Sequence, residues 1–438
     1  MPKEKVVVFV PGIMGSVLCL SKEVIWPGSL GSLLGSYKKM PQLMSPDLKA
    51  TDIIRKFGLV NVYSTLIEDL GRCGFYEDGA DPGLYTYPYD WRQSNTRAAD
   101  GLADLLDANV LKTHGASVEI MLIAHSMGGM VCRYYIESGK YSARPGFARV
   151  RNLITIGTPY RGTVLALTGA LGLEKRLFLS REQVKELVSD PRYPSLYEML
   201  PPGDEPFVWG TEGEKYDPRG AFEKLELVPE NLEAARTFRS GLDLAKGAKL
   251  ARYFAFYGTR QRTGVHVLLK ENSEPEAEQF DDAGDGTVPV WSGQPDGIQS
   301  MPVGGEHGTL FRNSDLKTKL GVLLGAPGLL AADVNVQLSV SPKVVEPGME
   351  VSTVLLFPTG IPEIAGEIRF LRVRMNDAGE AEGESPAGKP VTLQYSGGKA
   401  DKLGLLVRAP EIPGFYRVVF EADSGETAED ELIVQEPA

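Results

Sequence analysis

Residues 119–129 read EIMLIAHSMGG, and this stretch decides the fold. Its first half is a continuous apolar run of the kind that forms a strand buried on both faces. Helical spacing of apolar side chains starts directly after Ser126, which leaves room only for a sharp strand-to-helix turn. Such a turn needs small residues on both sides, here Ala124 and Gly128, because larger side chains would clash across it. The stretch therefore predicts a nucleophile elbow with Ser126 at its tip.

Three more apolar runs predict further strands of the same sheet. They span Lys5–Val10, Asn152–Ile156 and Arg252–Tyr257. Helix-like spacing occupies residues 96–111 and 127–138 between them. Short buried strands that alternate with helices indicate a parallel sheet covered by helices on both faces. Together with the elbow, this pattern predicts an α/β-hydrolase catalytic domain over residues 1–330.

The alternation is interrupted at residues 160–251, which we interpret as a cap inserted between two core strands. Long inserts in compact domains are usually functional lids or disordered segments, and we expect this cap to contribute to substrate binding. Its apolar part, Val164–Leu179, has two interpretations that the sequence leaves open. It either lines or covers an acyl channel, or it forms an ordinary buried cap helix.

From residue 331 the pattern changes to short strand-like runs separated by Gly, Pro and Asp. There are seven: Val334–Val340, Glu350–Phe357, Glu367–Arg374, Val391–Tyr395, Gly404–Arg408, Phe415–Phe420 and Asp430–Val434. Strands at this spacing predict an antiparallel β-sandwich, so we expect residues 331–438 to form an accessory immunoglobulin-like domain. Tyr416, in PGFYRVVF, occupies the position of a tyrosine corner.

Charge and cysteine content argue against several classes of protein. With 46 Lys and Arg against 58 Asp and Glu, the net charge of −12 disfavours bulk attraction to nucleic acid or to an anionic membrane. The 3 cysteines are odd in number and lack metal-ligand spacing, so we expect buried thiols, no metal and no cofactor. The N-terminus shows no signal-peptide pattern, and no apolar run has membrane-spanning length. We therefore expect a cytoplasmic location.

A serine nucleophile requires a base, and the chain has only 4 histidines. His114 precedes the nucleophile strand at its far end, and the side chain of His125 should point away from that of Ser126. His266 lies in an alternating apolar run, GVHVLL, that predicts a hairpin strand. His307 remains, in the flexible loop GGEHG before a final helical pattern, and this is where the fold places its base.

The carboxylate that orients the base should precede His307 in the chain. The segment DDAGDGTVP offers Asp281, Asp282 and Asp285, and we select Asp285 because it lies between two glycines and precedes TVP. A calcium loop is the competing interpretation of three aspartates so close together. The twelfth position from Asp281 is Ser292, however, rather than the bidentate Glu of an EF-hand.

An oxyanion hole needs two backbone N–H groups aimed at the charge that develops on the substrate. One normally belongs to the residue after the nucleophile, here Met127. The other comes from a loop after an early strand, and the glycine-rich segment PGIMGS makes the amide of Ile13 the candidate. A plain strand-to-helix turn is the competing interpretation of that segment.

Six motifs, in this order along the chain, resemble the lecithin:cholesterol acyltransferase family, which includes lysosomal phospholipase A2 and phospholipid:diacylglycerol acyltransferases. They are VFVPGIMGS, YPYDWR, IAHSMGGM, ITIGTPYRG, DAGDGTVP and GGEHGTLF, and they cover roughly residues 5–325. The resemblance implies an α/β-hydrolase that transfers an acyl group from a lipid ester to an alcohol or to water. It also implies catalytic roles for the matching residues Ser126, Asp285 and His307, and oxyanion roles for Ile13 and Met127.

The chain departs from that family in two respects. It has no evident cysteine pair to close a lid, as secreted mammalian members do, and its segment from Ser16 to Leu66 is shorter. Membrane docking in their manner is therefore not implied, and peripheral contact of the cap with a lipid interface remains an expectation. We expect Asp90 and Arg92 of the YPYDWR motif to fix loops rather than to react.

The sequence thus predicts a serine esterase or lipase that acts on lipid acyl esters through an acyl-enzyme, which water or an alcohol releases. The competing interpretation is a non-catalytic scaffold in which the C-terminal sandwich binds a partner. A decayed hydrolase is expected to lose a member of the triad, and all three positions are filled. We expect an ester as substrate and no nucleic-acid partner.

Overall fold

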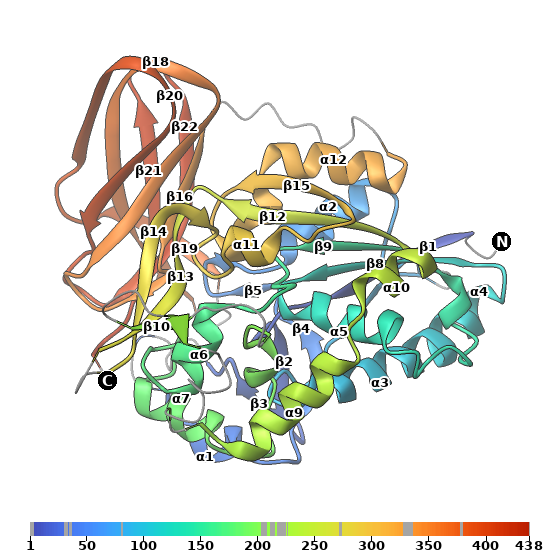
Figure 1. Cartoon of the computed structure of the whole chain (residues 1–438). Helices are drawn as coiled ribbons and strands as arrows, with labels where there is room; N and C mark the ends of the chain where they lie inside the picture. Colours follow the sequence, from blue (N-terminus) through green and yellow to red (C-terminus); the bar gives the residue numbers. More distant parts are fainter. Residues whose placement is uncertain are drawn as a thin grey trace.

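The computed structural model describes residues 4–29, 34, 37–79, 82–202, 208–210, 215–216, 225, 227–270, 274–326, 336–376 and 380–437. A parallel sheet covered by helices forms one part of the molecule, and a β-region in orange and red lies beside it (Figure 1). The predicted boundary between them, at residue 330, lies outside the described residues.

The central sheet has six strands in the order β15-β12-β9-β8-β1-β7, and all neighbours are parallel. They span Lys5–Val10 (β1), Leu84–Thr86 (β7), Glu119–His125 (β8), Val150–Ile156 (β9), Arg252–Thr259 (β12) and Gln299–Gly304 (β15). The four strands expected from apolar runs are all present. This sheet, with a strand-to-helix elbow after β8, is the α/β-hydrolase architecture that the sequence predicts.

Helices cover both faces of the sheet, as alternate side chains of β1 demonstrate. Val6, Val8 and Val10 pack into the cluster that contains the apolar sides of α3 and α5. Val7 and Phe9 pack into the opposite cluster, with α2 and α12. These helices span Asn95–Leu105 (α3), Met127–Glu137 (α5), Ser64–Arg72 (α2) and Ser314–Leu324 (α12). Strands buried on both faces explain why the sequence shows continuous apolar runs.

The insert between β9 and β12 forms helices below the sheet in Figure 1. They are α6 (Val164–Ala170), α7 (Arg181–Val188), α9 (Pro229–Ser240) and α10 (Leu244–Leu250). Strands β13 (Gln261–Leu269) and β14 (Glu276–Gly284) form a hairpin beside them, joined by β10 (Val208–Gly210) and β11 (Lys215–Tyr216). The apolar stretch Val164–Leu179 is not one helix, since α6 ends at Ala170 and Gly172 has a φ of 67°.

Short elements complete the first part of the chain. They are β2 (Ser16–Leu20), β3 (Glu23–Trp26), α1 (Met40–Leu43), β4 (Lys49–Ile53), β5 (Lys56–Phe57), β6 (Val60–Asn61), α4 (Lys112–His114) and α11 (Val290–Gly293). Helical structure after α3 continues to Leu111 as a π-helical turn, which agrees with the predicted helix. Among the described residues, no helix combines the length and apolarity needed to cross a membrane.

The C-terminal region is built from antiparallel strands around a separate apolar cluster. Its strands are β16 (Gln337–Ser341), β17 (Val344–Val345), β18 (Glu350–Met375), β19 (Ala381–Pro386), β20 (Val391–Arg408), β21 (Gly414–Ala422) and β22 (Thr427–Val434). Two predictions were wrong here, because the second and third predicted strands form the single 26-residue β18, and the fourth and fifth form β20. The pairing of β18 with β20 shifts register between Leu356 and Ile361, at Gly360 with a φ of 63°, so a bulge bends the strand instead of ending it.

Candidate active site

Ser126 forms the sharp turn between β8 and α5, with a φ of 52° and a ψ of −127°. Positive φ is strained for a residue with a side chain, and a nucleophile elbow has this strain. The Thr158 hydroxyl donates to the Ser126 carbonyl oxygen at 3.0 Å. A Cβ on Gly129 would lie 2.0 Å from Thr158 Oγ1, and one on Gly128 would lie 2.4 Å from the Pro11 carbonyl oxygen. The two glycines are therefore required by close approach of neighbouring chain segments.

The three predicted reactive side chains meet at this turn. His307 Nε2 lies 2.9 Å from Ser126 Oγ, and His307 Nδ1 lies 2.9 Å from Asp285 Oδ2. The other carboxylate oxygen of Asp285 accepts hydrogen bonds from the amides of Thr287 and Val288, at 3.0 and 2.7 Å. In this geometry the imidazole can accept the hydroxyl proton while the fully buried carboxylate holds the ring in place.

The pKa values of two histidines near Ser126 are shifted in opposite directions. Burial alone would lower the pKa of His307, but the charge and hydrogen bond of Asp285, with the charge of Glu306, raise that pKa above its ordinary value. Burial and the proximity of His307 instead lower the pKa of His125 to about 3. His125 is therefore neutral at any pH at which an esterase would normally work.

The sequence argues against His125 as the base, and the structure places its side chain beside the site, in contacts that the sequence does not indicate. Its Nε2 lies 3.0 Å from the His307 carbonyl oxygen and its Nδ1 lies 2.9 Å from the Tyr63 hydroxyl. Because a carbonyl only accepts, Nε2 carries the proton of the neutral ring and Tyr63 donates to Nδ1. The Tyr63 oxygen in turn accepts the Gly12 amide at 2.9 Å. This hydrogen-bonded chain joins the loop after β1 to the loop of His307.

The loop after β1 packs directly on the elbow. A Cβ on Gly12 would lie 2.9 Å from the Cβ of Ser126, and the Gly15 amide turns back to the Gly12 carbonyl oxygen at 3.1 Å. Ile13 lines the same cavity as Ser126. Met127 is the first residue of α5, where the amide has no acceptor within the helix. The two expected oxyanion donors thus flank Ser126.

The other candidates from the sequence lie elsewhere. Asp281 and Asp282 are exposed on β14, and Asp282 pairs with Lys402 of the C-terminal region. His266 is buried in the predicted hairpin, where it pairs with Glu278 on the opposite strand. In the described part of the chain, no group of His, Cys, Asp and Glu side chains could hold a metal ion.

Asp90 and Arg92 belong to the framework around the site. The Arg92 guanidinium is buried and donates to both oxygens of Asp90, at 2.8 and 2.7 Å. It also donates to the carbonyl oxygens of Leu43 and Ser45. These contacts fix the loop after α1 against the loop after β7, in agreement with the structural role expected for the motif.

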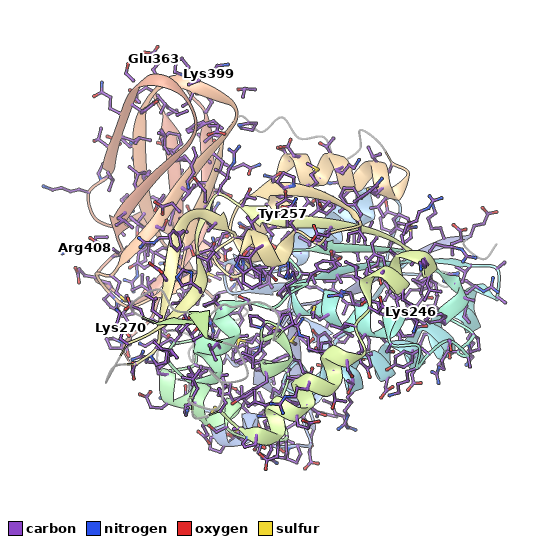
Figure 2. The ribbon with its side chains drawn as sticks, viewed as in Figure 1. Lys246, Tyr257, Lys270, Glu363, Lys399 and Arg408 are labelled. Atoms are coloured by element: carbon purple, nitrogen blue, oxygen red, sulfur yellow. The ribbon has the colours of Figure 1, made fainter. Side chains whose placement is uncertain are left out.

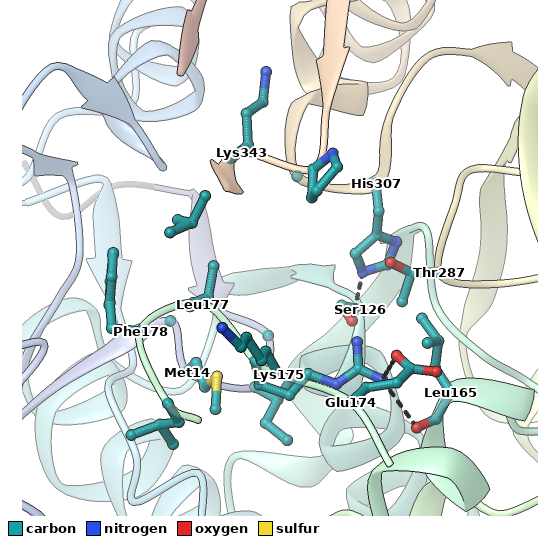
Figure 3. Close-up of a pocket in the computed structure, with 18 of the residues that line it drawn as sticks. Met14, Ser126, Leu165, Glu174, Lys175, Leu177, Phe178, Thr287, His307 and Lys343 are labelled. Atoms are coloured by element: carbon teal, nitrogen blue, oxygen red, sulfur yellow. Dashed lines mark hydrogen bonds and ion pairs between the residues drawn. The ribbon is translucent and has the colours of Figure 1, made fainter. Parts of the chain in front are cut away.

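A cavity of about 870 Å³ opens at Ser126 and His307. Figure 3 shows Met14, Leu177 and Phe178 around Ser126, with Lys343 of the C-terminal region beyond His307. Residues from both ends of the stretch Val164–Leu179 line the cavity, so this stretch contributes to its wall as well as to the core. A mostly apolar cavity of this size suits a substrate with a long hydrocarbon chain.

Comparisons with known proteins agree with the resemblance in the motifs. The family model "Lecithin:cholesterol acyltransferase" matches residues 32–219. The chain is 27% identical over 316 residues to Phospholipase A(1) LCAT3 of Arabidopsis thaliana, a match that covers 57% of this chain and 67% of that protein. It is also 27% identical over 329 residues to Lecithin-cholesterol acyltransferase-like 4 of Arabidopsis thaliana, covering 60% of this chain and 58% of the relative. These matches support the resemblance to that family within the residues that they cover.

Solved structures show only weak overall likeness. The mature Bacillus licheniformis lipase BlEst2 is 12% identical with a TM-score of 0.37, and the match covers 74% of this chain and 94% of that one. Phospholipase PlaB from Legionella pneumophila is 10% identical with a TM-score of 0.32, covering 98% and 90% of the two chains. Structural likeness at this level does not indicate a function for the site.

Proposed function

We propose that this lecithin:cholesterol acyltransferase-like chain is a serine hydrolase that cleaves lipid acyl esters through an acyl-enzyme. One observation carries the proposal: Ser126, His307 and Asp285 are joined by hydrogen bonds at one end of a large apolar cavity. The strained backbone of Ser126 supports it, since such strain persists where the surrounding structure imposes it for function.

In the proposed reaction, His307 takes the hydroxyl proton as Ser126 Oγ attacks the ester carbonyl carbon. Asp285 holds the tautomer of the imidazole and stabilises its cation. The amides of Ile13 and Met127 stabilise the oxyanion, at about 3 kcal/mol for each donor. His307 then protonates the departing alcohol, which leaves Ser126 acylated. Water or a second alcohol, deprotonated by His307, releases the acyl group.

The cavity favours an ester with a long acyl chain, because its wall is formed largely by apolar side chains. One relative is named a phospholipase A(1), which supports a phospholipid as one substrate to try first. Transfer of the acyl group to an alcohol is part of the proposal. The choice between alcohol and water depends on how far the cavity excludes water. We also propose peripheral contact of the cap with a lipid interface during substrate entry.

The test is hydrolysis of p-nitrophenyl esters, from acetyl to palmitoyl, by wild type and by Ser126→Ala. We expect the variant to lose about 10³- to 10⁶-fold in kcat, as when a reactive serine is removed from a working triad. Ser240→Ala, at an exposed serine of α9, is the matched control and should retain full activity. Full activity in Ser126→Ala would refute the proposal. An inert wild type that also fails to react with a fluorophosphonate would favour the scaffold interpretation.

We further propose that the C-terminal region, from about residue 331, is an immunoglobulin-like sandwich. Two features support this topology. Strand β17 pairs in parallel with the last strand, β22, while the other pairs are antiparallel. The Tyr416 hydroxyl, near the start of β21, donates to the Ile412 carbonyl oxygen at 2.5 Å, which is the contact of a tyrosine corner.

A further inference from the structure

One face of the C-terminal sheet carries a row of apolar residues at matching register. Val344 stands opposite Ile433, Ile433 stands opposite Phe415, and Phe415 stands opposite Val373. The row therefore crosses four strands, β17, β22, β21 and β18. Ile433, Phe415 and Val373 are almost fully buried, with 1%, 4% and 4% of their surface exposed.

This row belongs to the hydrophobic cluster of the hydrolase part. Val373, Phe415 and Ile433 are members of the cluster that also contains core strands and cap helices, and Val344 packs against it. Their sequence neighbours Val345, Tyr416 and Leu432 point the other way, into the C-terminal region's own core. Strand residues alternate between faces, so this sheet is apolar on both of them. A module attached for a separate task would be expected to keep one face in water.

The end of the row reaches the cavity that holds Ser126. Val344 and Ile433 both line it, together with Pro342 and Met349 from the same region. The cap contributes apolar side chains to the same cavity, among them Leu177 and Phe178. In Figure 3, Phe178, Leu177, Lys343 and Ser126 all border one space. Two parts of the chain far apart in sequence therefore form a single cavity wall.

Polar contacts fix the C-terminal region on two sides of this cavity. On the cap side, Lys175 forms an ion pair with Glu346. On the other side, Arg312, which follows the His307 loop, donates to Glu431 at 3.0 Å. A Cβ on Gly304, just before that loop, would lie 3.2 Å from Leu356 of β18. The tip of the region, with the exposed Glu363 and Lys399, points away from the hydrolase part (Figure 2).

We propose that the C-terminal region supplies one wall of the acyl-chain site, so that Val344 and Ile433 help to set which chain lengths are used. The inference rests on the proposed function and adds which part of the protein contacts the acyl chain of the substrate. The chain passes from Ser126 between the cap residues Leu177 and Phe178 and this wall. Each methylene that it buries contributes about fourfold to kcat/KM. Short chains do not reach the wall.

The test compares the chain-length profiles of Val344→Trp and of Leu406→Trp, the latter at a site on β20 that is 70% exposed. We expect Val344→Trp to lower kcat/KM for the palmitoyl ester at least about tenfold and to leave the acetyl ester within about twofold. Leu406→Trp should match wild type throughout. If Val344→Trp does not fold, Val344→Thr, of nearly the same shape, should lower the palmitoyl value severalfold. An unchanged ratio of palmitoyl to acetyl activity would overturn the inference.

A second measurement separates this inference from the proposed function. A dansyl-labelled undecanoic acid is titrated into Ser126→Ala with and without Val344→Trp, and fluorescence reports binding without chemistry. We expect the tryptophan to weaken binding at least about fivefold, given the methylenes it displaces. Equal affinity of the two proteins for the probe would refute the proposal that Val344 lines the acyl-chain site. If Val344→Trp weakens binding of the probe but wild type hydrolyses no ester, the proposed function is refuted and the inference about the wall is not.

Discussion

The Nε2 atom of His125 lies 3.0 Å from the backbone carbonyl oxygen of His307. His125 immediately precedes the proposed nucleophile, so this hydrogen bond ties the elbow to the loop that carries the proposed base. The link continues through the Tyr63 hydroxyl to the amide of Gly12, beside the expected oxyanion donor Ile13. Three separate loops are thus held at fixed distances by side chains that do not touch the reacting atoms. This arrangement pre-organises the site.

Tyr63→Phe tests that chain of hydrogen bonds. Without the hydroxyl, the Gly12 amide and His125 Nδ1 lose a buried partner, which should cost about 1–3 kcal/mol in free energy of unfolding. The loops should also move relative to one another, so we expect kcat to fall about tenfold with little change in KM. Tyr416→Phe removes a similar hydroxyl contact far from Ser126 and should lower stability without lowering kcat. Equal kcat values for the two variants would contradict a positioning role for Tyr63.

Asp285→Asn should change the pH dependence of the reaction. His307 acts as a base only when neutral, so kcat/KM rises with pH through the pKa of His307. Asp285 raises that pKa, which places the acid limb at a higher pH than the ordinary histidine pKa would. In Asp285→Asn, the acid limb of the kcat/KM profile should move to lower pH, and the plateau value of kcat/KM should fall by about 10⁴-fold. Asp282→Asn, at an exposed neighbour, serves as control, and a limb that stays in place in Asp285→Asn would count against this coupling.

Gly128→Ala should destabilise the elbow. The added Cβ would lie 2.4 Å from the Pro11 carbonyl oxygen, a backbone atom that cannot rotate away. We expect a loss of about 1–3 kcal/mol in free energy of unfolding, measured by urea denaturation. Gly404→Ala makes the same chemical change on β20, where no atom lies within 4 Å of the new Cβ, and should be close to neutral. Similar urea midpoints for both variants would show that the elbow can relax.

Asp430→Asn should alter stability in acid. Burial raises the pKa of Asp430, but the charges of Lys343 and Arg312 and the amide of Val340 outweigh it, so the pKa lies below its ordinary value. A lowered folded-state pKa gives stability that is present above the unfolded-state pKa, about 3.9, and is lost as pH falls through the folded value.

We therefore expect Asp430→Asn to lose up to about 3 kcal/mol near neutral pH, because its partly buried cationic partners lose their counter-charge. The variant should also show a flatter loss of stability below about pH 4 than wild type does. Urea midpoints measured across this range provide the check. Glu429→Gln, at an exposed neighbouring carboxylate, should follow the wild-type curve, and an identical curve for Asp430→Asn would refute the role of this carboxylate.

Local patterns in the sequence predicted the centre of the fold and selected the three side chains that meet at the elbow. Strands β1 and β8 are buried on both faces, so their apolar runs are unambiguous. The elbow also has a recognisable signature, since Gly128 and Gly129 lie where a Cβ would clash with the segments packed on the turn. Asp285 and His307 could be selected as candidates because chain order and loop composition left few alternatives.

Features that depend on contacts between segments distant in the sequence could not be predicted from local patterns. Tyr63 lies 62 residues before His125, and nothing in its own neighbourhood distinguishes a buried tyrosine that bridges two loops. The edge strand β15, QSMPVG, is short and contains a proline, so it lacks an apolar run. The bend in β18 carries residues typical of a turn, and only its continued pairing with β20 shows that the strand goes on. These features are determined by tertiary contacts rather than by local propensity.

The row of Val344, Ile433, Phe415 and Val373 has a thermodynamic consequence. Because these side chains share a cluster with the hydrolase core, melting of the C-terminal strands would expose apolar surface on both parts at once. Neither part can then lose its structure without weakening the other, and the whole chain should denature in a single cooperative heat-absorption peak rather than in two.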